Sequence, residues 1–482
     1  MILNMRSVKT NYIYNTIYQI IAIITPFVTT PYLSRVFGPN NIGIYSYLNS
    51  ILTYFLLFAF LGINSYGKRE IARYRDEPIK FSKTFWEIEL LCIISSSICC
   101  ALWFIYVLIN PEFQLYNCIL SIQIVSVAFD VSWLFSGLEL FDKIMLRNIF
   151  ARVVSLLLIF TTVNNEHDLW KLILILSLTP LICNVSLCIY AKHILKPTRI
   201  DFRNLRFHFL QTMIYFIPSI ATTIYSVLDK TMIQLITKDF YINGCYDQAV
   251  KLCSIPIALL VAMDNVMGSR MSYLVYVDRK DEIRERITKS ISFVGFLGTA
   301  MVFGLDAIID KLVPWFWGSG FDDINILVKI YSPIILCIGL NNCLSEQYLT
   351  PKGKRKQTAN IVIVGALLNL FLNFIFIPIC GAIGASMTSV FSELFIAFAY
   401  IFMCRKFISF EIYYAKFKNN VIAGLILYIF VLYFTSQWTA CYLTTLGQIF
   451  IGGIVYLIVL FLLKDEFIIK IILPEIRRWI LK

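Results

Sequence analysis

The chain has 482 residues, of which 59% are hydrophobic and only 15% are charged. These proportions exclude an ordinary water-soluble protein, because too few polar side chains are present to cover several soluble cores. The net charge of +12 would suit a nucleic-acid-binding protein, but the positions of the basic residues indicate membrane topology instead.

Apolar stretches follow one another almost without a break from about residue 11 to about residue 463. Each is near the roughly 20 residues that cross a bilayer as a helix, and lipid offers the backbone no hydrogen bonds. The predicted spans are 11–34, 43–65, 84–109, 116–137, 148–163, 169–191, 211–236, 247–267, 291–309, 325–349, 358–378, 382–404, 419–436 and 446–463. The sequence therefore predicts an all-α polytopic membrane protein with about 14 transmembrane helices and short connections.

Basic residues gather in every second connection between the predicted spans. The connection 67–83 is strongly basic, and so are those that begin near residues 192, 270 and 352. The alternate connections contain at most one basic residue each: Arg35, Lys238 or Lys311. This positive-inside asymmetry predicts that both termini lie in the cytoplasm, and it favours topology over contact with anionic lipid as the reason for the charge.

The basic connection 192–209 is the predicted boundary between two similar halves. We expect a six-helix lobe at 1–200, a second six-helix lobe at 201–410, and a segment at 411–482 that contains the last two transmembrane helices and a cytoplasmic tail. A weak repeat between the first and seventh spans supports this division: Tyr18, Pro26, Thr29 and Thr30 against Tyr215, Pro218, Thr222 and Thr223. Two six-helix halves have the same orientation, so a cavity is expected between them.

Charged side chains inside the predicted spans are candidates for function. A charge at the centre of a membrane helix costs about 2.5–3.5 kcal/mol or more, so it is expected to face protein or water. Asp229 and Lys230 are neighbours in the seventh span and diverge by about 100°, so each needs a different partner. Asp130 in the fourth span and Glu393 in the twelfth are, with Asp229, the deepest carboxylates, and Arg152 lies within the fifth span.

Polar residues near the ends of spans are expected to have simpler roles. Arg35 closes the first span, and Asp264 and Glu346 lie near the inner ends of the eighth and tenth spans, where each is expected to reach water. Three further residues are predicted to make hydrogen bonds between helices rather than ligand contacts: Asn184, Asn369 and Asn373.

Signatures of soluble enzymes are absent from the sequence. The three His lie in or near connections and have no metal-ligand spacing, and there is no glycine-rich phosphate loop with a following Lys. No outer connection is long enough for a polymerase or transferase site. We therefore expect a protein that is not an enzyme and that holds no cofactor or metal.

Two groups of short motifs carry a family resemblance. The first comprises TTPYLSRVFG at 29–38, NIGIYS at 41–46 and REIA at 69–72. The second comprises LDKTM at 228–232, YDQA at 246–249 and SYL at 272–274. In these motifs the chain resembles the polysaccharide-export flippases, which are the oligosaccharide-lipid translocases of bacterial O-antigen and capsule pathways. That family belongs to a larger superfamily that includes multidrug extruders and peptidoglycan lipid flippases.

The resemblance implies a function and a set of partners. It implies movement of undecaprenyl-diphosphate-linked repeat units from the cytoplasmic to the periplasmic leaflet of the bacterial inner membrane. The cavity between the two lobes would be cationic and the transport would be driven by ion-coupled alternating access. The expected partners are the lipid-linked oligosaccharide, the lipid bilayer, and a polymerase and chain-length proteins of the same pathway. Nucleic acid is not an expected partner.

Candidate site residues follow from the chemistry of such a substrate. Arg clamps diphosphate oxygens with two donors and Lys supplies a point charge, so the head-group candidates are Arg35, Arg152 and Lys230. A carboxyl group in apolar surroundings can carry a proton, so the candidates for coupling to a proton or Na⁺ are Asp229, Glu346 and Glu393.

Three other functions stay open at this stage. A cation-coupled multidrug exporter of the same architecture would favour an acidic or aromatic cavity rather than a basic one. A polymerase or lipid-linked transferase would need a catalytic loop outside the membrane. A peptidoglycan precursor flippase shares substrate chemistry, but the quoted motifs favour the O-antigen branch.

Overall fold

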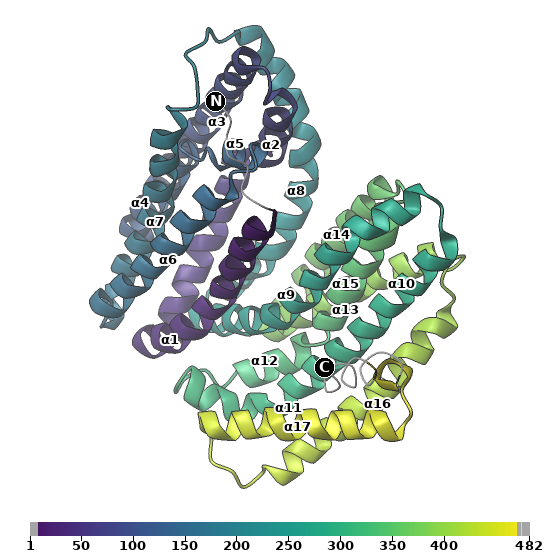
Figure 1. The fold of residues 1–482 in the computed structure, drawn as a ribbon. Helices are drawn as coiled ribbons and strands as arrows, with labels where there is room; N and C mark the ends of the chain where they lie inside the picture. The colour runs from purple at the N-terminus through teal and green to yellow at the C-terminus, as the bar shows by residue number, and fades with distance from the viewer. Residues whose placement is uncertain (1–7, 470–473, 475–482) are drawn as a thin grey trace. The chain divides into compact units, whose positions relative to one another are not determined.

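The structure is a computed structural model that describes residues 8–469 and 474, with side chains from residue 25 onward except at 218, 221, 222, 263, 265, 266 and 269. Every regular element in this part of the chain is helical (Figure 1). The α-helices are α1 (Val8–Phe60), α2 (Ile63–Tyr74), α3 (Pro78–Ile109), α4 (Gln114–Val127), α5 (Ser132–Gly137), α6 (Phe141–Thr162), α7 (Leu169–Ala191), α8 (Phe202–Thr237), α9 (Phe240–Tyr276), α10 (Lys280–Phe293), α11 (Thr299–Phe316), α12 (Ile324–Tyr331), α13 (Ile334–Leu344), α14 (Arg355–Cys380), α15 (Ala382–Cys404), α16 (Phe410–Phe434) and α17 (Tyr442–Leu462). The 3₁₀-helices are η1 (Pro111–Phe113) and η2 (Glu166–Asp168), and the π-helices are η3 (Val294–Gly298) and η4 (Ser345–Leu349).

The predicted all-α membrane fold is confirmed. Within the described residues, 12 helical segments are long and apolar enough to cross a membrane. The first of them, Thr25–Tyr74, contains the whole second predicted span and the end of the first. α8 covers the seventh predicted span, 211–236. The total of about 14 transmembrane helices stays a prediction.

Local sequence explains where two of the long helices break. Within α1, Gly38 has φ 65° and ψ 177°, outside the helical region. Glycine adopts this conformation without a steric penalty, and the following Pro39 disfavours a helical conformation in the residue before it. The fourth predicted span is interrupted at Asp130, whose Oδ1 accepts a hydrogen bond of 2.9 Å from the backbone N–H of Ser132 at the start of α5. Asp130 is therefore a half-buried turn residue and not a carboxylate inside a continuous helix.

The chain divides into two compact units, Met1–Thr231 and Met232–Lys482, and the boundary falls near the end of α8. In the described part of the first unit, α4 packs between α3 and α7, α6 packs against α7, and α1 contacts α3, α4 and α6 (Figure 1). The short helix α2 packs against α5 at Gly67, where a Cβ atom would lie 2.4 Å from the ring of Trp133. Only glycine permits so close an approach.

The second unit has two buried apolar clusters among its described residues. One joins α9, α10, α13 and α15 and includes Met271, Ile287 and Tyr400. The other joins α11 to the hairpin of α16 and α17 and includes Leu427 and Tyr456. The predicted lobe boundaries at residues 200 and 410 stay a prediction.

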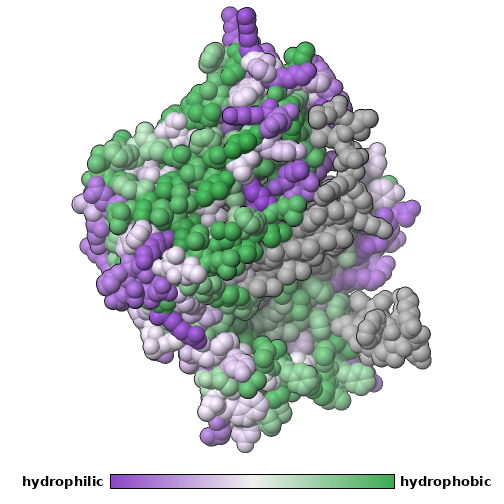
Figure 2. Space-filling view, turned by 60° about the vertical axis from the view of Figure 1, so that its left-hand side comes forward, coloured by the Kyte–Doolittle hydropathy of each residue, from purple (hydrophilic) through white to green (hydrophobic). Residues whose placement is uncertain are grey.

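Large apolar side chains are also exposed along most of the long helices. Ile105 and Leu108 of α3 and Phe450 and Phe461 of α17 are each more than half exposed. On the face shown in Figure 2, hydrophobic side chains cover broad continuous areas. Such a surface is unfavourable in water but is the expected one where lipid is the solvent.

Candidate functional site

The predicted head-group cations lie in the first unit. Arg35 of α1 is exposed, Arg152 of α6 is half-buried, and Lys230 near the end of α8 is half-buried. The neighbouring Asp229 is buried, with 7% of its surface exposed. The hydroxyl of Tyr54 on α1 lies 3.1 Å from the hydroxyl of Thr231, so the LDKTM motif at 228–232 is in contact with α1.

The other two predicted coupling residues lie in the second unit and differ in their surroundings. Glu393 of α15 is 7% exposed, and its Oε2 accepts a hydrogen bond of 2.6 Å from the side-chain amide of Asn341 on α13. Glu346 of η4 is exposed, as expected for a residue that reaches water. Burial therefore favours Glu393 over Glu346 as a residue that binds a coupling proton or Na⁺.

The expectation that Asp264 reaches water is wrong. Asp264 is 3% exposed, and its Oδ1 accepts a hydrogen bond of 2.7 Å from Nε2 of Gln347. The Oε1 atom of Gln347 in turn accepts one of 2.8 Å from the hydroxyl of Ser290. Gln347 lies in the π-helix η4, and irregular turns of this kind occur frequently at functional sites. The sequence did not reveal this chain because its members come from α9, α10 and η4.

The predicted interhelical hydrogen bonds of the three Asn residues are confirmed. Asn184 of α7 donates to the carbonyl of Ser126 on α4 at 3.0 Å. Asn369 of α14 donates to the hydroxyl of Ser389 on α15 at 3.5 Å, and Asn373 accepts from the hydroxyl of Thr388. Asn369 and Asn373 are fully buried, so these contacts form a polar seam between α14 and α15.

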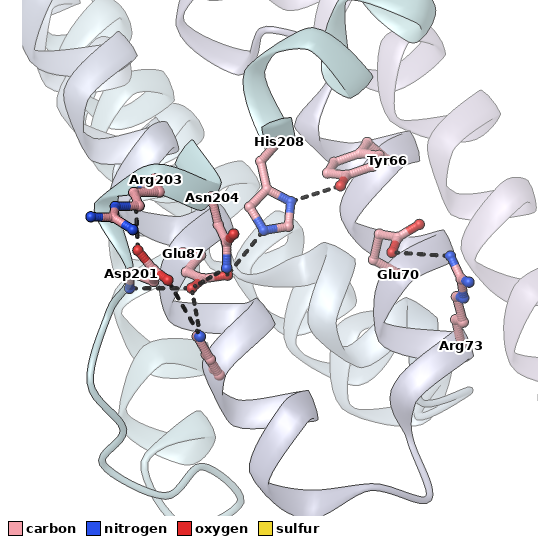
Figure 3. Close-up of polar contacts among 9 residues, drawn as sticks. Tyr66, Glu70, Arg73, Glu87, Asp201, Arg203, Asn204 and His208 are labelled. Atoms are coloured by element: carbon pink, nitrogen blue, oxygen red, sulfur yellow. Dashed lines mark hydrogen bonds and ion pairs between the residues drawn. The ribbon is translucent and has the colours of Figure 1, made fainter. Parts of the chain in front are cut away.

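A buried polar network at the start of α8 was missed by the sequence analysis (Figure 3). At its centre is Glu87 of α3, which is 2% exposed. Its carboxyl group accepts from the backbone N–H of Asp201 at 3.2 Å, from the amide of Asn204 at 3.1 Å and from Nε2 of His208 at 3.1 Å. Lys83 lies 3.7 Å from the same carboxyl group. Glu87 thus ties the connection 192–209 and the first turns of α8 to α3.

His208 extends the network to α2. Its Nδ1 atom lies 2.7 Å from the hydroxyl of Tyr66, which is fully buried (Figure 3). Because the carboxyl oxygen of Glu87 acts as an acceptor here, Nε2 carries the proton, and in the neutral ring Nδ1 accepts from Tyr66. The imidazole therefore bridges α2 and α3 and fixes the start of α8 against both.

One turn along α2, a second acidic group lies beside Tyr66. Glu70 is 4% exposed and accepts from the guanidinium of Arg69 at 2.8 Å, with Arg73 4.0 Å away. Arg69 also donates to the hydroxyl of Tyr215 on α8 at 2.8 Å. The REIA motif therefore contributes a second polar link between α2 and α8.

A sequence signal for part of this network existed. Glu87 lies inside the predicted span 84–109, and a charged residue within a span is a functional candidate with a partner to be found. His208 lies near a connection and has no metal-ligand spacing, so the sequence does not indicate a site there. Its partners are on helices more than one hundred residues earlier in the chain.

Comparison with known proteins extends these observations. The model of the family described as "Polysaccharide biosynthesis protein" matches residues 8–266. The chain is 25% identical over 396 residues to a "Putative O-antigen transporter" of Escherichia coli (strain K12), covering 81% of this chain and 95% of that protein. It is 22% identical over 375 residues to a protein of the same name from Shigella dysenteriae, covering 77% and 93%.

Two solved structures share the fold. The "Lipid II flippase MurJ, inward closed conformation" matches with a TM-score of 0.73 and 15% identity, over 94% of this chain and 99% of that one. An outward-facing multidrug resistance MATE family transporter of the MOP superfamily matches with a TM-score of 0.52 and 13% identity, over 82% and 92%.

Proposed function

Because the chain belongs to the polysaccharide biosynthesis protein family, we propose that it is a flippase for undecaprenyl-diphosphate-linked O-antigen or capsule repeat units. It would move them from the cytoplasmic to the periplasmic leaflet of the bacterial inner membrane, with both termini in the cytoplasm. The observation that carries this proposal is the family match over residues 8–266, joined to relatives named for O-antigen transport that align over nearly their whole length. The polymerase and chain-length proteins of the pathway are its proposed partners.

The substrate sets two physical requirements. Its sugar and diphosphate groups cannot cross lipid unaided, because each polar group without a partner costs several kcal/mol there. The diphosphate needs cationic partners, for which we propose Arg35, Arg152 and Lys230. No covalent bond has to form or break during such a transfer, so the protein is proposed to act as a transporter and not as an enzyme.

Ion-coupled alternating access is the proposed driving mechanism, with Asp229, Glu346 and Glu393 as candidate coupling groups. Glu393 and Asp229 are equally buried, and Glu393 is the one we test first because its carboxyl group accepts from the neutral amide of Asn341. A buried carboxyl group changes its interaction with such a donor when it gains or loses a proton or cation. That change can favour one conformation of the transporter over another.

The test is the leaflet distribution of the lipid-linked repeat unit in a strain that lacks the chain. Intact spheroplasts are labelled with a membrane-impermeant reagent, and the labelled and total lipid-linked units are compared. Units that accumulate on the inner leaflet, with no long-chain polysaccharide outside, are the expected result. Single units that reach the outer leaflet but never lengthen would show a polymerase instead. Normal polysaccharide with raised drug sensitivity would show a multidrug exporter.

A further inference from the structure

A long groove runs between α6 and α7 on the surface of the first unit. It has a volume of about 880 Å³ and is lined almost entirely by carbon atoms. Its floor is made of small side chains, including Ala151 and Ser155 of α6 and Thr179 of α7, where Ser155 and Thr179 lie 2.6 Å apart. Large exposed side chains, Phe150 and Ile182, stand at its edges. Small residues between large ones create the groove, so its shape is encoded in the sequence of these two helices.

The two ends of the groove differ in charge. At one end, the first turns of α6 and the end of α7 carry three cations, Lys143, Arg147 and Lys192, against one carboxylate, Asp142. Arg147 lines the groove itself, and its guanidinium is held at the mouth by donating to the carbonyl of Cys183 at 2.7 Å and to Oδ1 of Asn148 at 2.7 and 3.1 Å.

At the other end, one cation meets two carboxylates. Lys171 lines the groove and pairs with Asp168 at 2.7 Å, and Glu166 lies in the same short helix, η2. An anionic head group is therefore favoured at the Arg147 end only. Since α7 leads there into the basic connection 192–209, this is the end predicted to face the cytoplasm.

The length of the groove selects the kind of chain that fits it. The lining residues of α6 run from Arg147 to Thr162. At 1.5 Å per residue, that distance is about 22 Å. The hydrocarbon core of a bilayer is roughly 30 Å thick, so one leaflet supplies about 15 Å. One acyl chain of a phospholipid ends near the midplane and fills only the near part of the groove. A polyprenyl chain, which is longer than one leaflet, can occupy all of it.

We propose that the groove between α6 and α7 binds the polyisoprenoid tail of the transported lipid, with its phosphate at Arg147. This inference rests on the proposed function, because it takes the transported lipid to be a polyprenyl diphosphate. Binding of the tail on the lipid-facing surface of α6 and α7 holds the lipid to the protein while the tail stays in the hydrocarbon core. The tail leaves lipid rather than water, so its binding gains no hydrophobic transfer energy, and the packing of the tail against the groove decides the affinity.

The test measures binding of undecaprenyl phosphate to the purified full-length protein in detergent, by native mass spectrometry. Ala151→Trp fills the floor of the groove, and Ala101→Trp, at an exposed position on α3, is the matched control. Ser186→Trp is a second variant that narrows the Arg147 end from an exposed position, so that a folding defect of the first variant does not decide the outcome.

We expect the wild type to bind undecaprenyl phosphate about tenfold more tightly than farnesyl phosphate, whose chain is short. Ala151→Trp and Ser186→Trp should each weaken binding about tenfold, while Ala101→Trp leaves it unchanged. Equal binding by all three variants would overturn the inference. So would equally tight binding of phosphatidylglycerol in competition with undecaprenyl phosphate, because the groove would then hold ordinary anionic lipid.

The binding measurement tests the tail site, and the spheroplast labelling tests the proposed function, so one can be refuted without the other. If the labelling supports a flippase but the groove variants bind and export normally, the tail site is wrong and the function stands. If deletion of the chain leaves the leaflet distribution unchanged, the proposed function is wrong. Loss of polyprenyl binding in the two groove variants would then still support a polyprenyl site.

Discussion

The network around His208 makes a quantitative prediction about stability. In His208→Ala, the carboxyl group of Glu87 loses one donor and the hydroxyl of Tyr66 loses its acceptor, and both groups stay buried. Loss of a hydrogen bond to a charged group costs roughly 1.5–3 kcal/mol, and an orphaned neutral group costs roughly 1–3 kcal/mol. Glu87 keeps its contacts with Asp201 and Asn204. We therefore expect a total near the lower limit, about 3 kcal/mol.

The assay is SDS-induced unfolding of the purified protein in mixed micelles, followed by tryptophan fluorescence. Tyr66→Phe removes only the second contact of the ring and should lower the free energy of unfolding by about 1–2 kcal/mol. His193→Ala is the matched control, because His193 belongs to the same connection but is exposed, and it should change the free energy by less than about 0.5 kcal/mol.

A double-mutant cycle separates the contact from other effects of the substitutions. Tyr66→Phe combined with His208→Ala should be less destabilised than the sum of the single variants, by about 1 kcal/mol, because one hydrogen bond is removed in both. If His208→Ala is no less stable than His193→Ala, the buried network does not hold α8 and the reasoning fails.

Three further predictions concern other sites. Gln347→Leu removes the hydrogen-bond partner of the Asp264 carboxyl group and of the Ser290 hydroxyl, so it should lower the free energy of unfolding by about 2–3 kcal/mol. The control Glu346→Ala, in the same π-helix, should lower it by less than about 0.5 kcal/mol in the same assay. Gly67→Ala places a Cβ atom 2.4 Å from the indole ring of Trp133 and should lower the free energy of unfolding by about 1–3 kcal/mol. The control Gly304→Ala adds a Cβ atom that meets nothing within 4 Å, so its stability should be unchanged or raised. Equal melting temperatures for the two variants would contradict the packing argument. Glu393→Gln keeps the hydrogen bond to the Asn341 amide but removes the charge, so export of polysaccharide should fall about tenfold while the level of protein in the membrane is unchanged. Full export would exclude Glu393 as a coupling group.

The helical membrane fold could be predicted because it depends on local composition. A run of apolar residues in lipid has only one way to satisfy its backbone, and the length of the run sets the span. The break at Asp130 could not be predicted in the same way. Its side chain accepts from the backbone of Ser132, and an average over a long window does not register the competition of one side chain with the helix.

The polar networks could be predicted only in part, because their members are distant in the chain. Glu393 was identified from its depth in a span, and it is buried as expected for a costly charge. Asp264 was assigned to water from its position near a span end, but packing of α9 against α13 and η4 buries it. Position along one helix fixes depth in the membrane, whereas burial depends on which helices surround it.

The two π-helical turns bear on how this chain is aligned with its relatives. A π-turn contains about one residue more than an α-helical turn, so removal of one residue at 294–298 or 345–349 restores a regular helix without breaking it. Removal of a residue from a regular α-helix would instead rotate everything beyond it by about 100°. A single-residue gap at either place in a sequence alignment should therefore be interpreted as a straightened helix whose flanking turns present the same faces, and flanking residues should be matched by their partners rather than by their number.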